Sequence, residues 1–291
     1  MTPVTAIVTA YQRIEQTLET LRRLELCDPA PAEILVHIDG NQLDCAAAIR
    51  EAHPGTRVLV SATNIGPGGG RNRLLAEAAH EIVASFDDDS YPIDSDYFAR
   101  LVEVAGRFSE AAVIGAHIYH RDEPPAPDAP AASWVADFSG CGCAYRRSRF
   151  LATRGYVPLA TAYGMEEVDL ALQLHGRGQR VLQTPWLRVY HDTDRARHAD
   201  PEVTAASIAN LALLTYLRYP IAMWGVGVIQ CATRVWWCLT HARSRGILTG
   251  LARIPALVQK HAVARAPVSV TALRSYLRLR RRPVPAAMDG A

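Results

Sequence analysis

Short apolar runs alternate with segments whose apolar residues recur at helical spacing. The strand-like run VTAIVTA (4–10) precedes residues that share one face of a predicted helix: Ile14, Leu18, Leu21 and Leu24. The alternation continues with predicted strands at 33–39, 57–61 and 82–86 and predicted helices at 42–52 and 71–80. Strands separated by helices pair in parallel because the chain must cross back between them, so the pattern predicts an α/β/α sandwich.

The pattern becomes less regular between residues 95 and 200. In chain order it predicts a helix at 95–107, a strand at 111–119, a proline-rich surface excursion at 123–132, an edge-like segment at 134–150, a helix at 166–175, and a pair of strands at 180–185 and 186–191. No internal repeat is visible. Ligands of such sheets bind at the carboxyl ends of the strands, so we expect the functional residues to lie there.

The last ninety residues have a different character. Residues 203–218 predict an amphipathic helix, and residues 220–240 are apolar apart from Gln230 and Arg234. A spanning helix needs about twenty residues without a central charge, so a helix lying in the membrane interface is favoured over a spanning one. Tryptophans suit that interface, and this segment holds Trp224, Trp236 and Trp237. The alternative is a helical appendage packed on the rest of the chain.

Composition and charge narrow the class of protein. The chain has 291 residues, of which 49% are hydrophobic and 21% charged, which excludes disorder and collagen-like repetition. The net charge of +2 hides an asymmetry, because residues 203–291 carry twelve basic residues and one acid, Asp289. We expect a domain at 1–200 and a basic helical extension at 201–291. The acidic first part argues against a nucleic-acid partner.

The six cysteines form no CxxC pair, and the first residues lack the pattern of a signal peptide. Both observations favour free thiols in a reducing cytoplasm.

Three consecutive acids, Asp87, Asp88 and Asp89, directly follow the predicted strand 82–86. Adjacent carboxylates repel one another, so this placement favours a bound cation, and hard oxygen ligands suit Mg²⁺ or Mn²⁺ together with phosphate oxygens. The alternative is a solvated turn that caps a helix. Asp39 ends the second predicted strand and lies at the same sheet edge, although a turn or capping acid is equally expected there.

A glycine-rich segment, NIGPGGGRN (64–72), joins the third strand to the next helix. Glycine permits close backbone approach to a ligand, and Arg71 offers a donor for a base or phosphate. Further along the chain, Glu166, Glu167 and Asp169 open a helix, where acids either answer the helix dipole or supply a general base. His191 ends a strand and is either structural or a ligand for a divalent cation.

Taken in order, these segments resemble the inverting family 2 glycosyltransferases of the GT-A fold, in particular bacterial rhamnosyltransferase-like members. The resemblance runs from about residue 4 to 195. It implies that the domain at 1–200 divides into a nucleotide-binding part (1–119) and an acceptor-binding part (120–200). Its carriers are TAIVTAYQR, HIDGNQLD, NIGPGGGRN, FDDDS, GCGCAYRRSRF with RGYVP, MEEVDLALQLHGRGQRV, and VYH at 189–191.

The resemblance implies a role for each matching residue. Donor-binding residues would be Thr9, Ala10, Tyr11, Asp39, Asn64, Gly66, Arg71, Asp87 and Asp88. Asp89 and His191 would bind the metal, and Glu167 would be the base. Glu167 stands where the family usually has aspartate, so the base can instead be Glu166, and Pro158 replaces a frequent acid in the acceptor loop.

The resemblance also implies the reaction and its partners. We expect metal-dependent transfer, with Mn²⁺ or Mg²⁺, from a UDP- or dTDP-sugar to a hydroxyl acceptor with inversion. The acceptor is either lipid-linked, with the protein peripheral on the inner face of the membrane, or a soluble small molecule. A nucleotidyltransferase and a non-catalytic donor-binding protein are the alternatives.

Overall fold

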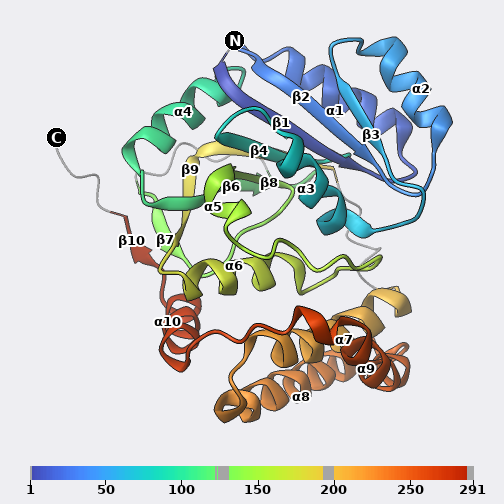
Figure 1. The fold of residues 1–291 in the computed structure, drawn as a ribbon, viewed down its shortest axis with the longest axis vertical. Helices are drawn as coiled ribbons and strands as arrows, with labels where there is room; N and C mark the ends of the chain where they lie inside the picture. Colours follow the sequence, from blue (N-terminus) through green and yellow to red (C-terminus); the bar gives the residue numbers. More distant parts are fainter. Residues whose placement is uncertain (1, 122, 124–130, 193–199, 287–291) are drawn as a thin grey trace.

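The computed structural model describes residues 2–121, 123, 131–192 and 200–286. Its strands are β1 (Thr2–Ala10), β2 (Pro31–Ile38), β3 (Arg57–Val60), β4 (Ile82–Asp87), β5 (Ser90–Pro92), β6 (Ala111–Tyr119), β7 (Ser133–Val135), β8 (Gly142–Arg146), β9 (Arg180–His191) and β10 (Val284–Pro285). They form one sheet in the order β10-β7-β9-β6-β8-β4-β1-β2-β3, with β5 paired to β9 (Figure 1).

The half of the sheet built from β3, β2, β1 and β4 is parallel, as predicted. In β1 every residue except Pro3 is buried, because helices cover both faces of the sheet and an apolar strand is stable only there. The register sets Ala10 opposite Ile38 and Thr9 opposite Asp87. The carboxyl ends of β1, β2 and β4 therefore meet at one edge of the sheet.

Helices cover both faces of the sheet, which confirms the predicted α/β sandwich. Apolar side chains of α1 (Ile14–Glu25), α2 (Leu43–Ala52) and α4 (Tyr97–Arg107) join one hydrophobic cluster. Those of α3 (Gly66–Glu77), α5 (Arg147–Leu151) and α6 (Glu166–Gly176) join a second cluster. The sheet separates the two clusters, so each layer of helices buries its own apolar face.

Three predicted elements differ in the structure. Helix α3 begins at Gly66 rather than at residue 71, so the glycines lie inside the helix; a Cβ on Gly70 would lie 2.6 Å from Nδ1 of His37. The expected strand pair at 180–191 is one strand, β9, whose register with β6 shifts around Pro185, a residue that cannot donate to a ladder. The segment expected at an edge includes β8, which lies inside the sheet between β4 and β6. Most of the excursion expected at 123–132 falls outside the described residues.

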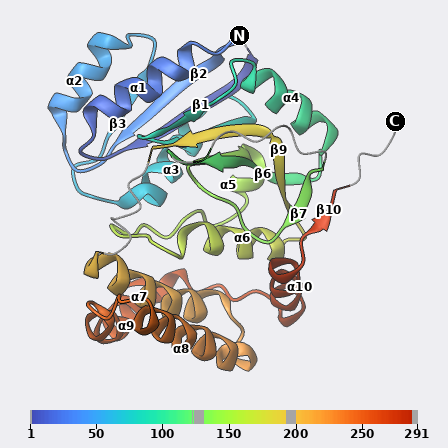
Figure 2. The same ribbon diagram turned by 180° about the vertical axis from the view of Figure 1, so that it is seen from behind.

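The C-terminal helices are α7 (Pro201–Arg218), the short η2 (Ile221–Met223), α8 (Trp224–Thr240), α9 (Ile247–His261), the short η3 (Ala262–Ala264) and α10 (Val270–Arg281). Figures 1 and 2 show α7, α8 and α9 on the far side of α6 from the sheet. Buried Arg218 of α7 joins buried Asp169 of α6, with Nε 2.5 Å from Oδ1. After α10, Val284 pairs with Trp134 of β7 and continues the sheet. Among the described helices, none combines the length and the apolar composition needed to cross a membrane.

Candidate active site

A cavity of about 590 Å³ opens at the edge where β1, β2 and β4 end. Its wall includes ten of the residues singled out from the sequence: Thr9, Ala10, Tyr11, Asp39, Asn64, Gly66, Asp87, Asp88, Asp89 and His191. Arg71, Glu166 and Glu167 lie outside this wall. The parallel register thus gathers side chains from five separate parts of the chain around one space.

Asp39 holds the turn that leads into α3. Its carboxylate accepts hydrogen bonds from the hydroxyl of Ser61 at 2.7 Å and from the backbone N–H groups of Ile65 at 2.9 Å and Gly66 at 2.8 Å. Gly66 has φ +72°, and a Cβ there would lie 1.8 Å from the carbonyl oxygen of Leu159. Asp39 therefore stabilises the glycine-rich turn, which agrees with its expected alternative role as a turn acid, while also lining the cavity.

Asp88 and Asp89 are buried, so the solvated turn considered for the acidic run is wrong. Asp88 accepts a hydrogen bond from the backbone N–H of Tyr11 at 3.1 Å and pairs with Arg13 at 3.1 Å. Burial raises the pKa of Asp88 to about 7, although Arg13 opposes the shift. Arg13 ends the segment TAIVTAYQR that carries the resemblance, but the sequence assigned it no role, because nothing in its spacing relates it to the acids at 87–89.

Asp89 contacts both Arg13 and His191. Nε2 of His191 lies 3.2 Å from Oδ1 of Asp89. Burial alone would raise the pKa of Asp89, but the hydrogen bond and charge of His191, together with Arg13, outweigh it and lower that pKa. Burial likewise disfavours charged His191, yet the adjacent Asp89 raises the pKa of the imidazole above its ordinary value. The two residues proposed as metal ligands from the resemblance thus lie in direct contact.

Arg71 lies behind the cavity wall and connects it to α6. The guanidinium is 2% exposed, and its two Nη atoms lie 2.5 Å from Asp87 and 2.7 Å from Glu166, while Nε donates to the hydroxyl of Ser85 at 3.2 Å. A buried charge of this kind requires such partners, because water cannot solvate it. In this structure Arg71 neutralises carboxylates at the cavity instead of facing into the cavity.

The two glutamates at the start of α6 have different surroundings. Glu166 is buried against Arg71, and burial raises its pKa to about 8 against the opposing charge of that arginine. Glu167 is half-buried, and its Oε1 accepts a hydrogen bond from the backbone N–H of Gly140 at 3.2 Å. Burial also raises the pKa of Glu167. Asp169, the third acid of this turn, pairs with Arg218 and lies outside the site.

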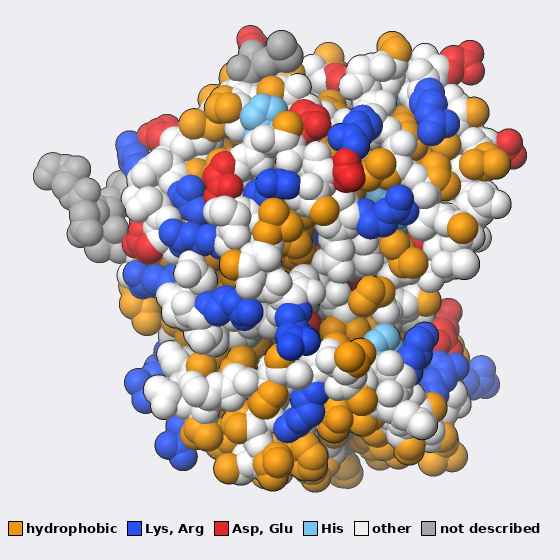
Figure 3. Space-filling model, viewed as in Figure 1, with side chains coloured by type: hydrophobic (Ala, Val, Ile, Leu, Met, Phe, Trp, Pro, Cys, Tyr) orange, Lys and Arg blue, Asp and Glu red, His pale blue; other side chains and the backbone are white. Residues whose placement is uncertain are grey.

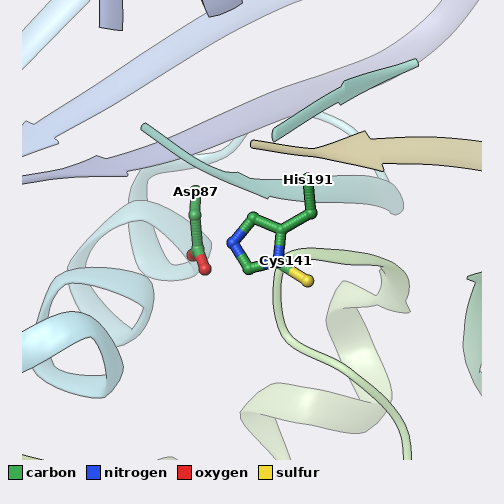
Figure 4. A group of neighbouring side chains, drawn as sticks. All are labelled: Asp87, Cys141 and His191. Atoms are coloured by element: carbon green, nitrogen blue, oxygen red, sulfur yellow. The ribbon is translucent and has the colours of Figure 1, made fainter. Parts of the chain in front are cut away.

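Potential metal ligands gather at the ends of three strands. One ligand atom each from Asp87, Cys141 and His191 lies within 4.8 Å of the other two, and Figure 4 shows these side chains together. Carboxylate, thiolate and imidazole form a donor set that suits a divalent transition metal, so these residues fit the ion that the resemblance implies. The sequence singled out Asp87 for the donor and missed Cys141, because the cysteines were judged only by CxxC spacing.

Comparisons with known proteins agree on the fold. The family model described as "Glycosyl transferase family 2" matches residues 5–150. No curated protein sequence matches the chain.

Three solved structures have a similar fold. A mannosyltransferase from Pyrobaculum calidifontis, in complex with GDP-Man and Mn²⁺, is 17% identical with a TM-score of 0.59, over 95% of this chain and 79% of that one. GalNAc-T7 with UDP, GalNAc and Mn²⁺ is 12% identical with a TM-score of 0.60, over 76% of this chain and 49% of that one. S. aureus TarS 1-349, in complex with UDP-GlcNAc, is 16% identical with a TM-score of 0.51, over 80% and 72%.

Proposed function

This chain belongs to glycosyl transferase family 2, and we propose that as a glycosyltransferase it moves a sugar from a nucleoside diphosphate to an acceptor hydroxyl with inversion. One observation carries the proposal. Asp87 of the cavity wall is joined through buried Arg71 to Glu166 at the start of α6. The positive charge of Arg71 also acts on the neighbouring Glu167, where it opposes the effect of burial on the pKa. A donor site and a candidate base are thus parts of one connected set of charges.

The cavity supplies the groups that a donor would need. Asp89 and His191, with Asp87 and Cys141 beside the histidine, would hold a divalent ion, which when bound would supply positive charge to the leaving diphosphate. Thr9 and Tyr11 line the same space and would lie against the nucleoside. The similar structures contain GDP-Man, UDP or UDP-GlcNAc, two of them with Mn²⁺, which supports a nucleotide-sugar donor here. We propose a UDP- or dTDP-linked sugar, with dTDP-rhamnose among the candidates.

We assign the base to Glu167. The Glu167 residue is half-buried, and its carboxylate accepts hydrogen bonds from the backbone N–H groups of Gly140 and of Glu167 itself, so lone pairs remain for an acceptor hydroxyl. The carboxylate of Glu166 is buried in its ion pair with Arg71 and is less available for that proton. A raised pKa makes Glu167 a better proton acceptor than an ordinary glutamate. The acceptor hydroxyl, losing its proton to Glu167, would attack the anomeric carbon and displace the nucleoside diphosphate in one step, which inverts that carbon.

The test is a panel of nucleotide sugars assayed for donor hydrolysis with Mn²⁺, with Mg²⁺ and with EDTA. We expect one donor to be hydrolysed only with metal, and we expect Asp89→Asn to abolish the reaction. Pyrophosphate release from a nucleoside triphosphate would instead identify a nucleotidyltransferase. Metal-dependent donor binding without turnover under any condition would identify a binding protein.

For the acceptor we propose a hydroxyl carried on a lipid, with the protein peripheral on the inner face of the membrane. The surface of the C-terminal helices supports this choice over a small acceptor free in solution.

A further inference from the structure

The outer surface of α8 and α9 presents large apolar side chains to solvent. Trp236 is 67% exposed and Leu248 is 81% exposed. We call the following six residues the α8–α9 face: Val228, Ile229, Trp236, Leu239, Leu248 and Leu251. Figure 3 shows hydrophobic side chains gathered over the end of the molecule where Figure 1 places these helices. A surface helix ordinarily turns polar residues outward, so this face is the reverse of the usual arrangement.

The opposite side of α8 is fixed in place, so the helix cannot rotate to bury these residues. A Cβ on Gly227 would lie 2.2 Å from the side chain of Thr215, which shows how closely α8 approaches α7. Cys238 is buried with Ile208 and Ile247, the latter at the start of α9. The packed side of α8 is thus already occupied, and the α8–α9 face remains outside.

Cationic and aromatic groups surround the same helices. The guanidinium groups of Arg234 and Arg243 lie 4.7 and 5.0 Å from the ring centre of Trp237, and that of Arg265 lies 5.4 Å from Trp224. Residues 203–286 contain no aspartate or glutamate. Arginine and tryptophan are the side chains that suit the headgroup region of a bilayer, and basic residues are attracted to anionic lipids.

We propose that the α8–α9 face rests on the surface of a bilayer that contains anionic phospholipid. A second copy of this chain is a poorer occupant, because it would bring two surfaces without acids and rich in arginine together. The helices would lie along the interface, with the apolar face inserted and the arginines at the headgroups. This surface goes beyond the proposed reaction; only its consequence, delivery of the sugar to a lipid-linked hydroxyl, rests on that proposal.

The test is flotation of the full chain with vesicles of phosphatidylcholine alone and of an equimolar mixture with phosphatidylglycerol. We expect the protein to float with the anionic vesicles at low salt and much less with the neutral ones. Trp236→Ser with Leu248→Ser should reduce binding at least tenfold. The matched control is Leu26→Ser with Leu43→Ser, two side chains that are each 61% exposed. Leu26 directly follows α1 and Leu43 begins α2, and Figure 1 shows both helices beside the sheet, away from α8 and α9, so this variant should bind like the parent.

Three results would overturn the proposal: no flotation of the parent at low salt, equal binding by the two double variants, or a parent dimer that only the Trp236 and Leu248 variant dissociates. The last would make the face a subunit interface. An assay of metal-dependent donor hydrolysis without vesicles distinguishes a failure of the membrane proposal from a failure of the proposed function. Intact hydrolysis without flotation contradicts the membrane surface alone, whereas flotation without hydrolysis contradicts the reaction alone.

Discussion

Exchange of the carboxylate of Glu167 for an amide should remove the base and leave the fold intact. The Gln side chain keeps the size of Glu and an oxygen that can accept the N–H of Gly140, so we expect Glu167→Gln to change the free energy of unfolding by less than about 0.5 kcal/mol. Loss of a general base typically costs about 10²–10⁴ in rate. That corresponds to about 3–5 kcal/mol in the activation free energy.

Glu166→Gln provides the contrast. Arg71 is buried between Asp87 and Glu166, so the variant leaves the guanidinium with one carboxylate instead of two. Above pH about 8, where Glu166 is ionised despite its raised pKa, breaking a buried pair costs about 3–5 kcal/mol, and since Asp87 remains we expect the lower end. At roughly 2–4 °C for each kcal/mol, this lowers the melting temperature by about 6–12 °C.

The assay combines initial rates of sugar release from the accepted donor with thermal unfolding of parent and both variants. The reasoning predicts an inactive, stable Glu167→Gln protein and a destabilised Glu166→Gln protein that retains activity below its melting temperature. An active Glu167→Gln enzyme beside a stable, inactive Glu166→Gln enzyme would refute it and move the base to Glu166.

Three further predictions concern pH, the junction of α6 with α7, and the thiol at the site. Because burial raises the pKa of Glu167, the rate should fall as the pH drops through a midpoint above the ordinary glutamate pKa of about 4.3. Glu167→Gln should remove this fall on the acidic side of the pH–rate profile, and a profile that keeps it contradicts the assignment of the base. Asp169→Asn leaves Arg218 buried without its counter-charge and should lower the free energy of unfolding, measured in urea, by about 3–5 kcal/mol. Glu202→Gln, which breaks an exposed pair with Arg253, should lower it by at most about 1 kcal/mol, and equal effects of the two variants argue against a stabilising buried pair. Cobalt added to the protein should give a thiolate-to-metal absorption band that Cys141→Ser lacks, and a band that persists in the variant excludes Cys141 as a ligand.

The strands that build the site could be predicted because parallel strands covered on both faces must be apolar throughout. VTAIVTA and IVASF carry that signal, and the acids at 87–89 follow directly from where the second run ends. The start of α3 could not be predicted, since glycines locally disfavour a helix. The reason for a glycine at position 70 is visible only in the structure, where His37 of β2 leaves no room for a larger side chain. The two strands expected at 180–185 and 186–191 are likewise one strand, because pairing with β6 continues on both sides of the irregularity at Pro185.

Contacts between distant residues set the limit within the site itself. Arg13 pairs with carboxylates seventy-five residues further on, and Cys141 meets His191 across the ends of two strands. Neither relation has a sequence spacing that would reveal it. The resemblance indicated the acids and the histidine by their order, but the structure alone shows that Arg71 bonds to Asp87 and Glu166 rather than facing into the cavity.

The most direct test of the account is a calorimetric titration of the full chain with UDP and with dTDP, in the presence of Mn²⁺ and in EDTA. The account predicts that one of these nucleotides binds with one site per chain only when the ion is present, and that Asp89→Asn abolishes this binding. Equal affinity in EDTA, or binding that persists in Asp89→Asn, would contradict the claim that the acids ending β4 hold a divalent ion on the donor's diphosphate.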